Sequence, residues 1–126
     1  MADTTGTMHI GELAERSGLS LRTLRHYDEI GLVSASGRTD GGFRLYTEED
    51  FDRLILIRRM KPLGFSLDQM SELLQVIDAL PDATAARSRL LREKLDGFIQ
   101  ETITRREGLR AQLAMSDEFL RLLQEH

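Results

Sequence analysis

The chain has 126 residues with 17 basic and 21 acidic side chains, so its formal net charge at pH 7 is −4. It contains no cysteine, which excludes disulfides, thiolate metal sites, iron–sulfur clusters and thiol redox sensing. No apolar run approaches a membrane span, and residues 1–7 have no signal-peptide core, so we expect a cytoplasmic protein with a short flexible tail at 1–7.

The first structured region is predicted to be two short helices joined by a tight turn. Residues 11–17 have the pattern of a two-turn helix closed by Gly18, and Ser20 and Gly31 are suitable caps for a second helix between them. Two short helices joined by a few residues that include glycine form a helix-turn-helix, although an ordinary helical hairpin has the same spacing.

One face of the second helix is basic, in a chain that is acidic overall. Arg22, Arg25 and His26 fall on one side by helical spacing, and residues 20–27 contain no acid. A helix that enters the major groove of DNA needs such a face. We therefore predict that this helix reads DNA.

The next segment has the pattern of a β-hairpin. A small, polar, glycine-rich stretch at 34–42 separates Leu32-Val33 from an alternating stretch at 43–46. Two short strands around a flexible tip satisfy this pattern and form a wing. Arg38 and Arg44 then lie where a wing can touch phosphates, whereas in a plain loop they would only be solvated.

Two further helices are predicted after the wing. The first begins at 47–50 with a hydroxyl cap and an acid three residues later, and it ends at 61–64, where Pro62 removes a backbone donor. The second begins with a capping box at 66–69. Their apolar positions, which we assign to the core, are Phe51, Leu54, Ile55, Ile57 and Met60 in the first and Leu67, Met70, Leu73, Leu74 and Ile77 in the second.

Residues 81–126 are predicted to form one long amphipathic helix capped by Asp82. About 40 residues span roughly 60 Å, which is too long to bury an apolar stripe on a core this small, so we expect a second copy of the helix to cover it. The alternative is two shorter helices broken near Gly108. The predicted dimer-interface residues are Leu91, Leu95, Phe98, Thr102, Leu109, Leu113, Phe119 and Leu123.

No catalytic constellation is found. The three histidines His9, His26 and His126 are far apart and have no partners at metal-ligand spacing. The glycines at 41–42 do not open a helix after a strand, so a phosphate-binding loop is not indicated. We expect neither an enzyme nor a resident metal or cofactor.

Four segments, at 10–14, 23–32, 42–46 and 63–67, together resemble the MerR family of bacterial transcription regulators. The resemblance covers about Met8 to Ile77 and is most specific over 24–32. Ala35 stands where a proline is frequent in the family, and Phe43 where tyrosine is frequent.

The resemblance implies a mainly α fold: a winged helix-turn-helix at 8–80 with two further helices, and a dimerisation helix at 81–126 in an antiparallel coiled coil. It implies that the basic helix contacts DNA, with Arg22 on base edges and Arg25 on phosphates. The implied DNA contacts are Ser20, Arg22, Thr23, Arg25 and Tyr27 from the helix, joined by His26 on the basic face, and Arg38, Arg44 and Tyr46 from the wing, with Lys61 as a further phosphate candidate.

The resemblance also implies a function. Family members bind a pseudo-palindrome in a promoter as homodimers and distort the DNA, which realigns the elements that RNA polymerase reads. The family's metal and redox sensors use cysteines, which this chain lacks. Three possibilities remain for control: a small apolar molecule between the dimer helices near Phe98, Ile99 and Phe119; no ligand, with control by abundance or a protein partner; or action as a plain repressor or architectural binder. A helical interaction module that does not bind DNA is the competing class.

Overall fold

The computed structural model describes residues 6–126 and forms two compact units, one extending to Ser71 and one from Glu72 to His126. The boundary predicted at 80/81, between a DNA-binding domain and a dimerisation helix, divides the chain by function and stays a prediction. Of the predicted tail, residues 1–5 lie outside the described residues. Thr7, assigned to the same tail, instead begins strand β1 (Thr7–His9), because it pairs with Thr47. No helix in residues 6–126 is long and apolar enough to cross a membrane.

The predicted helix-turn-helix is present as α1 (Ile10–Ser17) and α2 (Leu21–Glu29). Ser20 caps α2, since its Oγ accepts a hydrogen bond from the Thr23 N–H at 3.0 Å. At the other end, Gly31 has a φ of 73°, and the Leu32 N–H donates to the Tyr27 carbonyl at 2.9 Å. This is a Schellman motif, so the helix ends at a residue that tolerates left-handed backbone.

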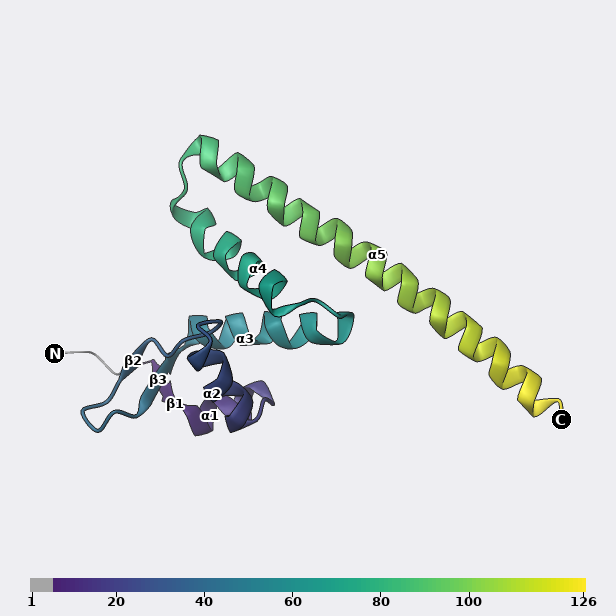
Figure 1. The fold of residues 1–126 in the computed structure, drawn as a ribbon, viewed down its shortest axis with the longest axis horizontal. Helices are drawn as coiled ribbons and strands as arrows, with labels where there is room; N and C mark the ends of the chain where they lie inside the picture. Colours follow the sequence, from purple (N-terminus) through teal and green to yellow (C-terminus); the bar gives the residue numbers. More distant parts are fainter. Residues whose placement is uncertain (1–5) are drawn as a thin grey trace. The chain divides into compact units, whose positions relative to one another are not determined.

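A wing is present, but its first strand lies inside the stretch that was predicted to be the flexible tip, and Leu32-Val33 forms no strand. Strand β2 (Gly37–Arg38) pairs antiparallel with β3 (Arg44–Thr47), and Arg38 lies directly opposite Arg44. Strand β1 pairs with the other edge of β3, so the sheet order is β1-β3-β2. Figure 1 shows β3 flanked by the other two strands, with the wing tip extending beyond them.

Helix α3 (Glu48–Met60) follows β3 without a loop. Thr47 and Asp50 form the predicted capping box, and Leu54 and Ile57 are completely buried. The 3₁₀ turn η1 (Lys61–Leu63) and the left-handed Gly64 then end the element. Phe51 and Ile55, predicted as core, are only partly buried.

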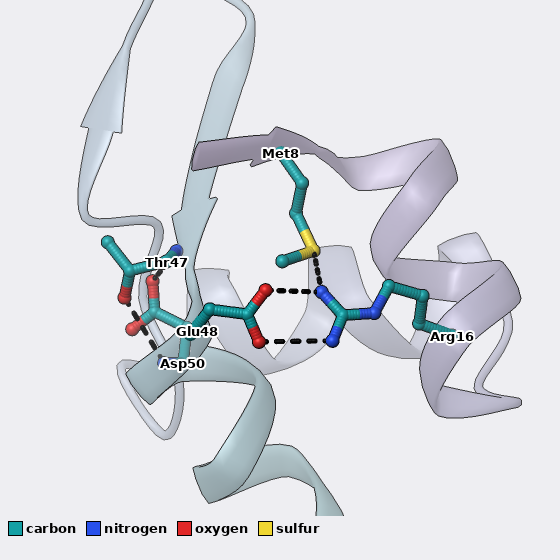
Figure 2. Close-up of polar contacts among 5 residues, drawn as sticks. All are labelled: Met8, Arg16, Thr47, Glu48 and Asp50. Atoms are coloured by element: carbon teal, nitrogen blue, oxygen red, sulfur yellow. Dashed lines mark hydrogen bonds and ion pairs between the residues drawn. The ribbon is translucent and has the colours of Figure 1, made fainter. Parts of the chain in front are cut away.

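Arg16 joins three elements of the first unit (Figure 2). From α1 it makes two hydrogen bonds to the Glu48 carboxylate at the start of α3, at 2.6 and 3.0 Å. Its guanidinium also contacts the sulfur of Met8 in β1 at 3.6 Å and lies 4.3 Å from the centre of the Phe51 ring. The hydrogen bonds between these two side chains are the main reason that the pKa of Glu48 is lowered and the pKa of Arg16 is raised.

The second unit begins at Glu72, within the next helix. This helix, α4 (Leu67–Ala79), begins at the predicted capping box, in which Ser66 and Gln69 exchange hydrogen bonds. Leu73 and Leu74 are buried as predicted. Leu67 is 46% exposed, so its assignment to the core is wrong, because the first residue of a helix lies at the rim of the packed face. Val76, which the pattern did not single out, is buried.

Helix α5 (Ala85–Gln124) has 40 residues and no interruption at Gly108 (Figure 1), so the alternative of two shorter helices is wrong. Its N-cap is Thr84, whose Oγ accepts from the Arg87 N–H at 3.3 Å. The predicted cap Asp82 instead ends the 3₁₀ turn η2 (Leu80–Asp82), because the chain makes one more turn at Pro81 before it straightens.

Tyr46 is a core residue, which corrects its assignment as a DNA contact. Its side chain comes from β3, whose alternate residues point inward, and it is 1% exposed. Burial raises the pKa of its hydroxyl, and that hydroxyl has no hydrogen-bond partner among the described residues.

We predict that Tyr46→Phe leaves the free energy of unfolding unchanged or raises it by up to about 1 kcal/mol, because an unpartnered buried hydroxyl is removed while the ring stays. Urea unfolding measures this change. Tyr46→Ala is the control and should cost about 3–5 kcal/mol through the lost ring. DNA affinity of the phenylalanine variant should stay at the wild-type value; a clear loss would show that the hydroxyl reaches DNA.

Candidate nucleic-acid interface

The basic face of α2 lies on the surface as predicted. Arg22, Arg25 and His26 are exposed. None of Arg22, Arg25 and Lys61 is paired with a carboxylate within residues 6–126. These three cations are therefore free to meet an anion, while His26 contributes a ring that lies 6.3 Å from that of Tyr27.

A concave surface lies beside this face and has a volume of about 1030 Å³. It brings Lys61, from the 3₁₀ turn after α3, together with the basic residues of α2, as the resemblance implies. Phe65, just before α4, and Leu67 and Met70, at its start, add an apolar part to the lining. The lining residues are Arg22, Thr23, Arg25, His26, Tyr27, Glu29, Lys61, Phe65, Leu67 and Met70.

The remaining predicted residues of α2 have structural roles of their own. Ser20 uses its hydroxyl to cap the helix, and the same hydroxyl donates to the Thr23 Oγ at 2.9 Å. Tyr27 is 5% exposed, and burial raises the pKa of its hydroxyl. Tyr27 is therefore mainly a core residue that contributes a small part of its surface to the concave region.

The turn between α1 and α2 is held by Arg58 of α3. Its guanidinium donates to the Ser17 carbonyl at 2.9 Å. Gly18 has a φ of 71°, and a β-carbon there would lie 3.1 Å from the same guanidinium. The pattern did not reveal this role, because a surface arginine and a backbone carbonyl leave no distinctive spacing in a sequence.

Asp28, near the end of α2, holds the base of the wing. Its Oδ2 accepts from the Arg44 Nε at 2.6 Å and lies 3.5 Å from a terminal nitrogen of Arg38. Its Oδ1 accepts from the Ala35 N–H at 3.0 Å. The hydrogen bond from Arg44 is the main reason that the pKa of Asp28 is lowered, so the carboxylate is ionised at neutral pH.

This arrangement alters the prediction for the two wing arginines. Arg44 is 24% exposed and its charge is matched by Asp28, so it is less available to a phosphate than its place in the wing suggested. Arg38 is 52% exposed and also donates to the Gly42 carbonyl at the wing tip at 3.0 Å. The spacing of 16 residues between Asp28 and Arg44 gave no indication that they would meet.

Asp50 of α3 binds Ser36, the residue that follows Ala35 at the base of the wing. Its Oδ2 accepts from the Ser36 hydroxyl at 2.6 Å and from the Thr47 N–H at 2.9 Å, and its Oδ1 pairs with Arg53 at 3.1 Å. Asp50 is only 3% exposed. Two consecutive wing residues, Ala35 and Ser36, are thus tied to α2 and α3 respectively.

The predicted dimer residues lie on α5, and most of them leave apolar surface in water. Leu109, Leu113, Phe119 and Leu123 are between 47% and 63% exposed. Thr102 is exposed, while Leu95 and Phe98 are partly covered. Leu91 is 7% exposed, so its side chain is already covered within one chain and is not free for a partner.

The described part of the chain holds no group of three or more histidine, aspartate or glutamate side chains arranged to bind a metal ion. Around α2 and the wing, Asp28 and Asp50 form ion pairs, while Arg22, Arg25 and Lys61 carry unpaired charge on one surface. Such an arrangement suits contact with a polyanion.

Two family models match the chain. One, described as MerR HTH family regulatory protein, covers residues 8–77, and the other, described as MerR, DNA binding, covers residues 51–115. The first match includes the helix-turn-helix, the wing and the concave surface.

Characterised proteins and solved structures agree with these matches. ZntR, an HTH-type transcriptional regulator of Escherichia coli, is 35% identical over 92% of this chain and 77% of its own length. The nodulation protein NolA of Bradyrhizobium elkanii is 42% identical over 68% of this chain. The crystal structure of HiNmlR, a MerR family regulator lacking the sensor domain and bound to promoter DNA, superposes with a TM-score of 0.64 at 28% identity over 94% of this chain and 85% of its own.

The match to NolA covers only 44% of that protein's length, and a match to a mercuric resistance operon regulatory protein of Bacillus cereus covers 52%. The chain thus spans about half the length of some curated relatives. The shared part is the helix-turn-helix and the elements that follow it. The chain belongs to the MerR family of helix-turn-helix regulatory proteins.

Proposed function

We propose that this chain is a sequence-specific DNA-binding transcriptional regulator that binds a pseudo-palindromic promoter operator as a homodimer. The observation that supports this function best is the single surface on which Arg22, Arg25 and Lys61 present unpaired charge beside an exposed helix. A helix of this kind fits the major groove, while flanking cations meet phosphates. The promoter complex of the related HiNmlR supports the same assignment.

The homodimer is proposed from the surface of α5. A 40-residue helix with exposed leucine and phenylalanine along one stripe is rarely stable alone in water. A second copy running antiparallel covers the same stripe with the same residues, which is the simplest closed symmetry. Arg105, Gln112 and Ser116 interrupt the stripe, and polar positions of this kind select register.

A dimer of two such readers has two binding faces at a fixed separation, which we propose to match a two-fold operator. Bending or untwisting a promoter between the two half-sites costs several kcal/mol, so contact with both half-sites must supply that energy. RNA polymerase at the realigned promoter is the proposed partner, and the bacterial cytoplasm, where promoter DNA lies, is the proposed location.

We propose no resident metal or cofactor. The chain lacks the cysteine ligands that a thiolate metal site or an iron–sulfur cluster needs. Among the three possibilities for control, abundance or a protein partner and a plain repressor are favoured together over a small apolar effector, because the apolar residues of α5 are explained by the dimer stripe.

The wild-type chain should bind its own upstream DNA far more tightly than an unrelated duplex, with affinity falling steeply between roughly 50 mM and 200 mM salt because counterions are released from neutralised phosphates. Fluorescence anisotropy titrations at both salt concentrations measure this, and footprinting should show two-fold protection. The absence of binding at low salt would contradict the proposal and favour a helical interaction module.

We expect the Arg22→Ala and Arg25→Ala variants to change DNA binding in different ways. The first should relax preference at one base position by about 1–3 kcal/mol, because a bidentate contact to a base edge is lost. The second should weaken all sequences alike and reduce the salt slope by about one unit. Binding to a panel of single-base operator variants separates them, and a uniform loss for Arg22→Ala would make it a phosphate contact.

Replacing both Leu109 and Leu113 with glutamate should weaken dimerisation by at least about a hundredfold, because two carboxylates would be buried without partners. Sedimentation equilibrium measures the dissociation constant. Ala111→Glu is the matched control, since Ala111 is exposed and lies on the opposite face of the same helical turn. A double variant that dimerises as well as the control would exclude this stripe from the interface.

A further inference from the structure

We propose that Asp28 is a positioning residue that fixes the wing on the recognition helix and cancels part of the wing's positive charge until DNA is bound. The proposal rests on the DNA-binding function above. It is based on one observation, which is that the Asp28 carboxylate contacts Ala35, Arg38 and Arg44. These residues belong to three successive parts of the wing.

The placement of Asp28 is not explained by the stability of its own helix. It lies in the last turn of α2, where the helix dipole presents its negative end, so an acid there is unfavourable. The side chain is also only 12% exposed, which adds a desolvation cost. The contacts that offset both effects are those to the wing, with the Arg44 Nε at 2.6 Å and the Ala35 N–H at 3.0 Å.

The wing needs a nearby anion. Arg38 and Arg44 are paired across β2 and β3 in the antiparallel register, and like charges directly opposite one another repel. Asp28 lies within ion-pair distance of both. In the free protein it therefore supplies the counter-charge that a DNA phosphate would supply in a complex.

The same carboxylate connects the two elements that contact DNA. Asp28 is on α2, three residues after Arg25, and its partners form the base and both strands of the wing. A wing that is fixed relative to the helix reaches phosphates at one register only, so contacts by both elements require the spacing of the operator. A released wing would bring two free arginines to any duplex.

Asp28→Asn tests the proposal, since asparagine keeps an oxygen for the Ala35 N–H and loses the charge. We expect tighter binding to unrelated DNA at low salt, a salt slope steeper by about one unit, because about one more phosphate is neutralised, and a several-fold lower ratio of operator to unrelated affinity. Asp40→Asn is the control, because Asp40 lies exposed at the wing tip and its loss changes the net charge equally. The double variant Asp28→Asn with Arg44→Gln should return the slope to the wild-type value.

The second experiment measures amide hydrogen exchange in the protein without DNA. Exchange across residues 35–44 should be faster in Asp28→Asn than in wild type, with α1 unchanged. If that variant does not fold, Arg44→Gln takes its place and should show the same faster exchange.

The proposal would be overturned if Asp28→Asn and Asp40→Asn had the same salt slope, the same ratio of operator to unrelated affinity and the same amide exchange. It would also be overturned if amide exchange across the wing were unchanged in Arg44→Gln. Wild-type protein that fails to prefer its operator would contradict the proposed function instead, and the exchange measurements would still decide whether Asp28 positions the wing.

Discussion

Everything in the first unit depends on one shared core beneath the DNA-reading helix. Leu13 of α1, Leu24 of α2, and Leu54 and Ile57 of α3 are all at most 1% exposed. They come from three short helices. None of these helices is long enough to be stable in water on its own. Their mutual burial therefore both forms the helices and leaves only the opposite face of α2 in solvent, which is where its arginines lie.

A core of this size fixes which elements pack together more firmly than it fixes their relative angles. Charged hydrogen bonds join the same elements at the edges of the core. Arg16 binds Glu48, Arg58 binds the Ser17 carbonyl, and Asp28 and Asp50 bind the base of the wing. Such bonds are directional and short. The basic face of α2 and the wing, which we propose to contact DNA, are thus joined to the rest of the unit by groups that are not themselves proposed DNA contacts.

For helix α5 the main constraint is its exposed apolar surface. It has 40 residues, and from residue 106 onward every side chain is exposed. Apolar surface of this extent is stable in water only when something covers it. In the proposed homodimer a second copy of α5 covers this stripe, and the separation of the two copies of α2 follows from that pairing.

The sequence alone determined the elements of this fold. Glycines at helix ends, capping pairs such as Thr47 with Asp50, and helical or alternating spacing of apolar residues are local features, and local geometry follows from them. Most helix ends and the basic face of α2 were therefore predictable, and the resemblance added their order. The start of α5 and the first strand of the wing were misplaced by a few residues. The errors at Thr7, Leu67, Leu91 and Tyr46 concern burial or pairing between distant segments, which spacing along one element does not report. Only the tertiary structure decided that Asp28 meets Arg44, that Arg58 holds the turn, and that the Tyr46 ring lies inside, because these contacts join residues whose separation in sequence carries no period and whose meeting depends on how the whole core packs.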